Sequence, residues 1–398
     1  MKRPVQPGEA ERLDLSNTDL QAAWALLDHA VAQQDIPGGV ALVARHGHFA
    51  TYAAGHAVLG SDAKIPASAH TLYDCASLTK VVVTLPLILL LSDQGKLQLN
   101  DPAAAYVPEF GESGKDAATI CQLLAHTSGL AAHCDLYSHG WTPDEMFMHI
   151  CRMKPVYVPG TRCVYSCLGY IVLGRIAERL LGEPLAQAAE RLLFRPLGMA
   201  ASRYNPPCEW RPRIAATEYD PALDGFRWGR VHDENADAFG GACGNAGLFA
   251  TAGDLARYAQ MWLASANAGG SVDEAGAAAH HCAYSPPGTA FNTHAAQAIA
   301  LLSPSAVRQA LSSHTRHIPG AHRGLGWVLK NDPADVTGSG FSPSSYGHTG
   351  FTGTSLWIDP EHDLAVVLLT NRVHFGRNAS IAKLRHDFHQ AVAAALRA

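Results

Sequence analysis

Three serine–lysine pairs in the chain have the spacing Ser-x-x-Lys and could act together in catalysis: Ser61 with Lys64, Ser77 with Lys80, and Ser380 with Lys383. On a helix, residues three apart share a face, so a neutral lysine amine could accept the proton of the serine hydroxyl. Such a pair predicts nucleophilic attack by serine on an acyl carbonyl. Because the motif occurs three times, its spacing alone is weak evidence.

The surroundings of Ser77 distinguish it from the other two serines. It opens the stretch SLTKVVVTLPLILLL, which predicts a helix that is apolar almost all round and places Lys80 in the interior. Burial disfavours the ammonium form, so we expect a lowered pKa and a neutral amine. Ser61 follows a glycine in a predicted loop, and Ser380 begins a predicted solvated helix. From these residues alone, catalysis is as good an explanation as a capping serine with a snorkelling lysine.

Elements at both ends of the chain predict one antiparallel sheet flanked by helices. Helical spacing of apolar residues covers about 17–33, and two strands follow around a turn at 45–47. A second hairpin turns at 359–362, and a helix follows from about 380 to 396. The sequence therefore predicts an α+β fold of the α/β sandwich type in a single module. Residues 17–74 and 301–398 form its sheet part, and 75–300 form a large, inserted, mainly helical part.

Composition and charge restrict the partners. A net charge of -5 over 398 residues offers no basic surface for nucleic acid. The longest apolar run, 81–91, is shorter than the roughly 20 residues that span a bilayer. The N-terminus lacks an apolar signal-peptide core, and nine cysteines form no repeated pairs, so we expect a cytoplasmic protein. The histidine and acidic residues around 126–139 lack the spacing of metal ligands. Nothing in the sequence indicates an oligomeric state.

Further motifs lie along the chain in a recognisable order. Tyr165-Ser166-Cys167 lies in GTRCVYSCLGYIVLG, and His348-Thr349-Gly350 lies in YGHTGFTGTSLWIDP. Two auxiliary stretches are LLAHTSGL at 123–130 and GNAGLFATAGDLARYAQMWL at 244–263. Together with Ser77-Leu-Thr-Lys80, this series resembles the serine beta-lactamase and penicillin-binding protein superfamily. The resemblance is to the branch of class C-like hydrolases, family VIII carboxylesterases and D-amino-acid peptidases, and it covers residues 71–360.

The resemblance implies a beta-lactamase/transpeptidase-like fold and an acyl-enzyme mechanism. Ser77 would attack an acyl carbonyl, while Lys80 and Tyr165 share the proton between nucleophile and leaving group. The backbone N–H groups of Ser77 and Phe351 would form the oxyanion hole. Water would then hydrolyse the acyl-enzyme. The implied substrate is a small-molecule acyl ester or amide, and the resemblance implies neither a metal nor an organic cofactor.

Two departures from the family pattern bear on the substrate. His348, next to Thr349 and Gly350 in the substrate-binding motif, stands where many members have lysine and would offer a weaker, pH-dependent positive charge. Cys167 stands where asparagine is usual and offers no amide to grip an acylamido side chain. We therefore expect an esterase on small acyl esters. The alternatives are a D-amino-acid peptidase or beta-lactamase, acyl transfer, and a binding protein that senses peptidoglycan fragments without turnover.

Overall fold

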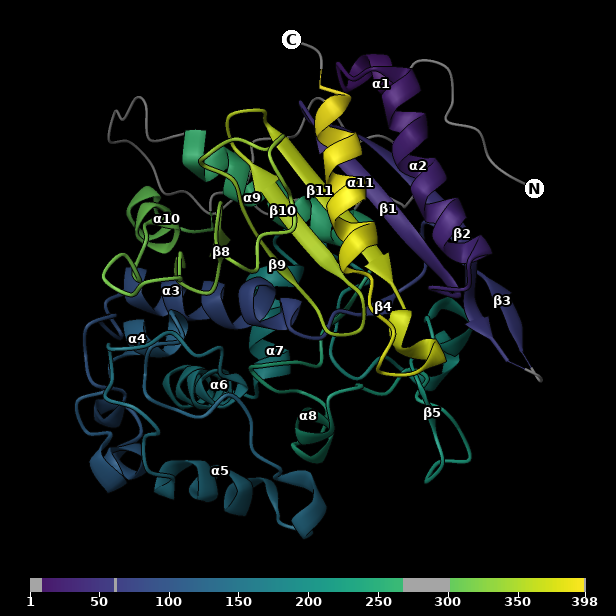
Figure 1. Cartoon of the computed structure of the whole chain (residues 1–398). Helices are drawn as coiled ribbons and strands as arrows, with labels where there is room; N and C mark the ends of the chain where they lie inside the picture. Colours follow the sequence, from purple (N-terminus) through teal and green to yellow (C-terminus); the bar gives the residue numbers. More distant parts are fainter. Residues whose placement is uncertain (1–8, 61–62, 268–300, 397–398) are drawn as a thin grey trace.

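A computed structural model describes residues 9–60, 63–267 and 301–396. Its main feature is a seven-stranded sheet in the order β3-β2-β1-β11-β10-β9-β8 (Figure 1). The first three strands come from the N-terminal part of the chain: β1 (Gly38–Arg45), β2 (His48–Leu59) and β3 (Lys64–Pro66). The other four come from the C-terminal part: β8 (Val328–Leu329), β9 (Tyr346–Thr349), β10 (Ser355–Asp359) and β11 (Leu364–Thr370). Each sheet pairing is antiparallel, so the predicted sheet from both ends of the chain is confirmed.

Both predicted hairpins are present, and their registers join the two ends of the chain. Arg45 pairs with His48 across the first turn, and Asp359 pairs with Leu364 across the second. Strands β1 and β11 then pair from Gly39↔Thr370 to Arg45↔Leu364. All residues of β1 and β11 are buried, because helices cover both faces of the sheet at these central strands.

The helices α2 (Asn17–Ala32) and α11 (Ala382–Ala394) pack side by side on one face of the sheet, with the short α1 (Glu9–Arg12) beside them (Figure 1). The side chain of Ser16 caps α2 by accepting from the N–H of Asp19, as the sequence predicts. The terminal helix was expected to begin at Ser380, but it begins two residues later. Ser380 is exposed before that start.

The opposite face of the sheet is covered by α9 (Ala252–Asn267), which contacts β1, β10 and β11. This helix belongs to the segment predicted as an insertion, yet it packs on the sheet. Beyond it lies a mainly helical part, which Figure 1 shows below the sheet. Its α-helices are α3 (Leu85–Asp93), α4 (Ile120–Leu124), α5 (Pro143–Arg152), α6 (Cys167–Leu181), α7 (Leu185–Ala189) and α8 (Glu234–Ala238). The helix α10 (Pro304–Leu311) contacts α3 and α9.

Two further pairs of short strands lie outside the seven-stranded sheet. The strand β4 (Tyr73–Asp74) pairs with β7 (Phe249–Ala250), and β5 (Tyr219–Asp220) pairs with β6 (Gly225–Phe226). After β4 and a turn, the helix that carries Lys80 contains a π-helical segment, Lys80–Thr84, before it continues as α3. The N–H of Leu85 bonds to the carbonyl of Lys80, five residues back. The next residue, Pro86, has no N–H to donate, which favours an irregular turn at this place.

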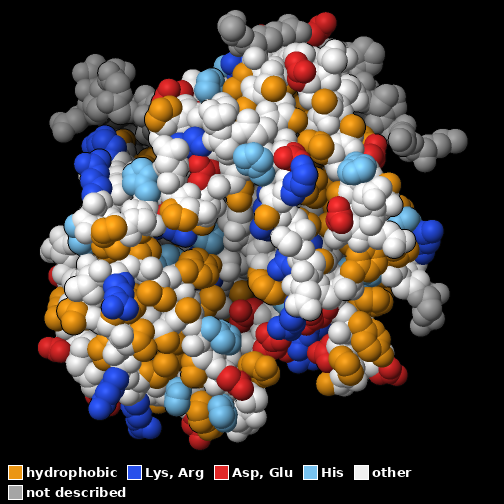
Figure 2. Space-filling model, viewed as in Figure 1, with side chains coloured by type: hydrophobic (Ala, Val, Ile, Leu, Met, Phe, Trp, Pro, Cys, Tyr) orange, Lys and Arg blue, Asp and Glu red, His pale blue; other side chains and the backbone are white. Residues whose placement is uncertain are grey.

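The surface carries charges of both signs. Figure 2 shows a face on which acidic and basic side chains are intermingled rather than gathered into a patch of one sign. Within the described ranges, no helix has the length and hydropathy needed to cross a bilayer. The same ranges hold no group of three or more His, Cys, Asp or Glu side chains arranged to bind a metal ion.

Candidate active site

Among the three serine–lysine pairs, Ser77 and Lys80 lie in contact. The Nζ of Lys80 donates to the Oγ of Ser77 at 3.1 Å, to the carbonyl of Asn245 at 2.9 Å and to the Sγ of Cys167 at 3.5 Å. Lys80 is fully buried, whereas the side chain of Lys383 is 87% exposed and pairs with Asp387. Ser61 lies outside the described residues. The predicted burial of Lys80 is therefore confirmed.

The hydroxyl of Tyr165 lies in the same buried region. The Nζ of Lys80 is 5.1 Å from the centre of the Tyr165 ring. The hydroxyl makes no well-aligned hydrogen bond with the described residues. Burial raises the pKa of Tyr165, while the charge of Lys80 acts to lower it. Ser77, Lys80 and Tyr165 thus form one cluster in which a proton can be transferred between side chains.

The protonation state of Lys80 differs from the prediction. Burial by itself lowers the pKa of Lys80, but the negative charge that Cys167 and Tyr165 can carry raises it, and the net shift of the pKa is upward. The expectation of a lowered pKa for Lys80 is therefore wrong. Desolvation alone would lower the pKa of Lys80, but the tertiary structure also brings Cys167 and Tyr165 to the amine.

His348 also differs from the prediction, which gave it a pH-dependent positive charge. The residue lies in β9 and is buried, and burial together with the charges of Arg323 and Lys80 lowers its pKa to about 3. Its Nδ1 lies 2.8 Å from the carbonyl oxygen of Thr349, which can only accept. The ring proton therefore sits on Nδ1, and Nε2 carries a lone pair. A neutral ring of this kind does not attract a substrate carboxylate by charge.

This state of His348 predicts the pH dependence of substrate binding. A histidine whose pKa is lowered to about 3 stays neutral from pH 5 to 8, so its charge does not change in that range. We expect the KM values of matched anionic and neutral esters to follow the same pH dependence. Steady-state kinetics between pH 5 and 8 measure this. If KM rose for the anionic ester alone near pH 6.5, the ordinary pKa of histidine, His348 would titrate in contact with the substrate.

Two residues of the auxiliary motifs, His126 and Asn245, lie beside the cluster, although no role was predicted for either. His126 accepts from the backbone N–H of Ser166 at 3.1 Å, and its ring centre lies 4.5 Å from that of Tyr165. Burial is the main reason why the pKa of His126 lies well below its usual range. The backbone carbonyl of Asn245 is an acceptor for Lys80. The auxiliary motifs pointed to these two residues, but a motif does not predict which atoms lie in the site.

The third motif lies against the turn that carries Ser77. A Cβ on Gly350 would come within 2.5 Å of the carbonyl oxygen of Cys75, so only glycine fits there. Phe351 follows, and it is 48% exposed. Among the described residues, the backbone N–H groups of Ser77 and Phe351 donate no hydrogen bond, whereas the N–H of Gly350 donates to Thr354. Both groups are thus free to donate to a substrate oxygen.

Comparison with known proteins identifies the class of this protein. A family model described as Beta-lactamase matches residues 24–390. The putative D-alanyl-D-alanine carboxypeptidase of Escherichia coli (strain K12) is 33% identical over 342 residues, which cover 78% of this chain and 71% of that one. The chain therefore belongs to the beta-lactamase family, and it is a serine hydrolase.

Solved structures place the fold within the same class. A class C beta-lactamase aligns with a TM-score of 0.71 at 21% identity, over 96% of this chain and 97% of that one. EstCE1, a hydrolase with promiscuous acyltransferase activity, aligns with a TM-score of 0.69 at 22% identity, over 94% of this chain and 99% of that one. A penicillin-binding protein homologue from Caulobacter crescentus aligns with a TM-score of 0.69 at 22% identity, over 95% of this chain and 98% of that one. The predicted α+β, beta-lactamase/transpeptidase-like fold is confirmed.

Proposed function

We propose that Ser77 is the nucleophile of this hydrolase and that the preferred substrates are small acyl esters. The observation that carries the assignment is the contact of 3.1 Å between Ser77 Oγ and the buried Lys80 Nζ, next to the hydroxyl of Tyr165. Ser77 is itself partly exposed, so a substrate carbonyl can reach it. A serine that attacks an acyl carbonyl needs this combination of access and a proton acceptor.

The mechanism depends on one proton shared by Lys80 and Tyr165. Lys80 and Tyr165 titrate as a coupled pair, and the pair must have lost a proton before it can accept that of Ser77. The positive charge of Lys80 favours the Tyr165 phenolate, which then takes the proton as Ser77 attacks. The pair returns that proton to the leaving alcohol. The N–H groups of Ser77 and Phe351 stabilise the oxyanion, and water then hydrolyses the acyl-enzyme.

The preference for esters over amides depends on Cys167. Cys167 is the first residue of α6, and its Sγ lies 3.5 Å from the Nζ of Lys80. An asparagine at this position could reach an acylamido group with its amide. A thiol is a weak donor and cannot accept and donate at two atoms as an amide does. Simple esters carry no acylamido group, so they are indifferent to this loss.

A substitution at this position tests the preference. We expect Cys167→Asn to raise the rate of penicillin acylation severalfold and to leave ester hydrolysis almost unchanged. A hydrogen bond that forms in the transition state contributes about 0.5 to 1.5 kcal/mol, or up to roughly tenfold in rate. The acylation rate should be measured directly, because slow deacylation hides a gain in turnover. A variant without any gain would remove Cys167 as the reason for the preference.

A second candidate function is hydrolysis of D-amino-acid peptides or beta-lactams. The 33% identity with a putative D-alanyl-D-alanine carboxypeptidase supports it. A third is a sensor of peptidoglycan fragments that is acylated without turnover. Intact-protein mass spectrometry after a fluorophosphonate, a short-chain nitrophenyl ester and a penicillin separates these functions when turnover is measured alongside. Fast ester turnover supports the proposal, and stoichiometric acylation without release supports the sensor.

Two expectations from the sequence stay proposals. We retain a cytoplasmic location, which the sequence favours and which fractionation of cells that express the full-length protein would test. We also retain the division into parts at 17–74, 75–300 and 301–398, with the qualification that α9 packs on the sheet. Limited proteolysis would show whether cleavage occurs near these bounds.

A further inference from the structure

We propose that Asp74 is a positioning residue that aligns the two N–H groups of the oxyanion hole through contacts with His232 and the third motif. This inference rests on the proposed function, because it concerns the same nucleophile. Asp74 ends β4, is 2% exposed and lies three residues before Ser77. No motif in the sequence assigns a role to Asp74 or to His232.

The first part of the inference concerns the turn before the nucleophile. Asp74 Oδ1 accepts from the N–H of Ala76 at 2.8 Å. Ala76 has a φ of 45°, which is disfavoured for a residue with a Cβ and needs support from its surroundings. Thr79 adds a second contact, because its hydroxyl donates to the carbonyl of Ala76 at 2.7 Å. The direction of the Ser77 N–H therefore depends on a turn that Asp74 holds.

The second part concerns the other donor, Phe351. The backbone carbonyl of Asp74 accepts from the hydroxyl of Thr352 at 2.7 Å, which ties the residue after Phe351 to β4. Asp74 Oδ2 accepts from the N–H of His232 at 2.7 Å. The ring of His232 in turn stacks on that of Phe351, with centres 5.6 Å apart. Asp74 thus contacts both sides of the proposed oxyanion hole.

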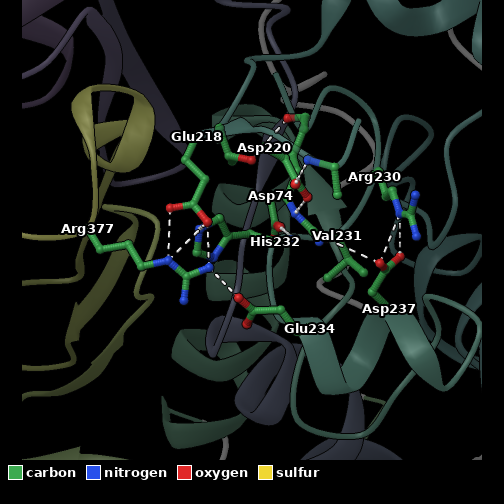
Figure 3. Close-up of polar contacts among 12 residues, drawn as sticks. Asp74, Glu218, Asp220, Arg230, Val231, His232, Glu234, Asp237 and Arg377 are labelled. Atoms are coloured by element: carbon green, nitrogen blue, oxygen red, sulfur yellow. Dashed lines mark hydrogen bonds and ion pairs between the residues drawn. The ribbon is translucent and has the colours of Figure 1, made fainter. Parts of the chain in front are cut away.

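His232 is held from its other side by an ionic network, which Figure 3 shows around it. Its Nε2 lies 3.2 Å from Glu218 Oε1, and Glu218 accepts from Nε of Arg377 at 2.9 and 3.0 Å. Arg377 also pairs with Glu234. Burial raises the pKa of Glu218, but His232 and Arg377 together lower it to about 2, so Glu218 stays ionised. The ring of His232 thus lies between this network and Phe351, with Nε2 near Glu218 but without a well-aligned hydrogen bond among the described residues.

The substitution Asp74→Asn tests the inference with a small change in shape. An asparagine keeps one acceptor oxygen, but its NH₂ group cannot accept from the second N–H. We expect kcat for a short-chain nitrophenyl ester to fall about a hundredfold, as on loss of an oxyanion donor, with KM changed less than about threefold. Active-site titration with a fluorophosphonate corrects kcat for any unfolded fraction. A kcat within threefold of the wild type would overturn the inference.

Asp254→Asn is the matched control for the loss of a buried aspartate. Asp254 is 4% exposed and accepts from the N–H of Ala201 and the hydroxyl of Ser202, both at 2.9 Å. We expect a lower Tm for this variant with an unchanged kcat. If Asp74→Asn does not fold, Thr352→Val tests the link between the third motif and β4, because it removes the hydroxyl that donates to the backbone carbonyl of Asp74, and we expect kcat to fall about tenfold. An unchanged kcat in Thr352→Val would then contradict the inference.

Hydrogen exchange measured by mass spectrometry makes the test independent of turnover. In Asp74→Asn, peptides that cover 74–80 and 349–354 should both exchange faster than in the wild type, while Asp254→Asn should leave them unchanged. A wild type that neither labels at Ser77 nor turns over esters would contradict the proposed function, and the exchange result would still decide the role of Asp74. Faster exchange in only one of the two segments would contradict their coupling through Asp74.

Discussion

Replacing Ser77 by alanine should abolish ester hydrolysis and covalent labelling by a fluorophosphonate. The hydroxyl is the only atom removed, and it contacts the Nζ of Lys80 at 3.1 Å. Removal of the nucleophile in serine hydrolases lowers kcat by on the order of 10⁶-fold, so we expect activity at the background level. Because Lys80 keeps the carbonyl of Asn245 as an acceptor, the variant should fold with a Tm close to that of the wild type.

Ser380→Ala is the matched control, because Ser380 belongs to the same tetrad pattern but is exposed before α11. It should retain wild-type turnover and labelling. Peptide mapping of the labelled wild type should place the adduct on Ser77. Labelling that persists in Ser77→Ala would mean that another residue is the nucleophile and would overturn the assignment of the site.

Replacing Lys80 by arginine should lower kcat/KM for esters by about a thousandfold, the middle of the range for loss of acid–base catalysis. A guanidinium keeps the positive charge but does not release its proton at ordinary pH. If the proton passes through the Lys80–Tyr165 pair, charge alone is not sufficient. The site is tightly packed, since Lys80 is fully buried, and the larger head group will cost some stability.

For that reason, Lys80→Met is measured beside Lys80→Arg. Methionine fills a similar volume without a charge, so at least one of the two variants should fold well enough for thermal denaturation and labelling of Ser77 to be measured. Lys383→Arg is the control, because that lysine is exposed and should tolerate the change. A folded Lys80→Arg variant whose kcat/KM lies within tenfold of the wild type would show that Lys80 acts only as a fixed charge.

The large features of the fold follow from local sequence. The apolar spacing of 17–33 and the turn residues at 45–47 and 359–362 predict elements that the structure contains, because periodicity and turn chemistry act within a few residues. The order of the motifs indicated the family, because it can be followed along the chain without knowledge of the contacts. The exceptions depend on contacts between distant segments. Packing of α9 on β1, β10 and β11 joins residues far apart in the chain, and periodicity does not reveal it.

In the candidate site, too, some features follow from local sequence and others depend on the tertiary structure. The sequence by itself predicted a buried Lys80 beside Ser77, because spacing and an apolar helix are local features, but it left a snorkelling lysine as an equal alternative. The structure decides for burial. Only the tertiary structure decided the direction of the pKa shifts. Burial acts to lower the pKa of Lys80, but the pKa is raised because distant segments bring Cys167 and Tyr165 beside the amine. His348 has a lowered pKa because packing buries it near the charges of Arg323 and Lys80. Electrostatic effects depend on distance in space, and distance in space is a property of the folded chain.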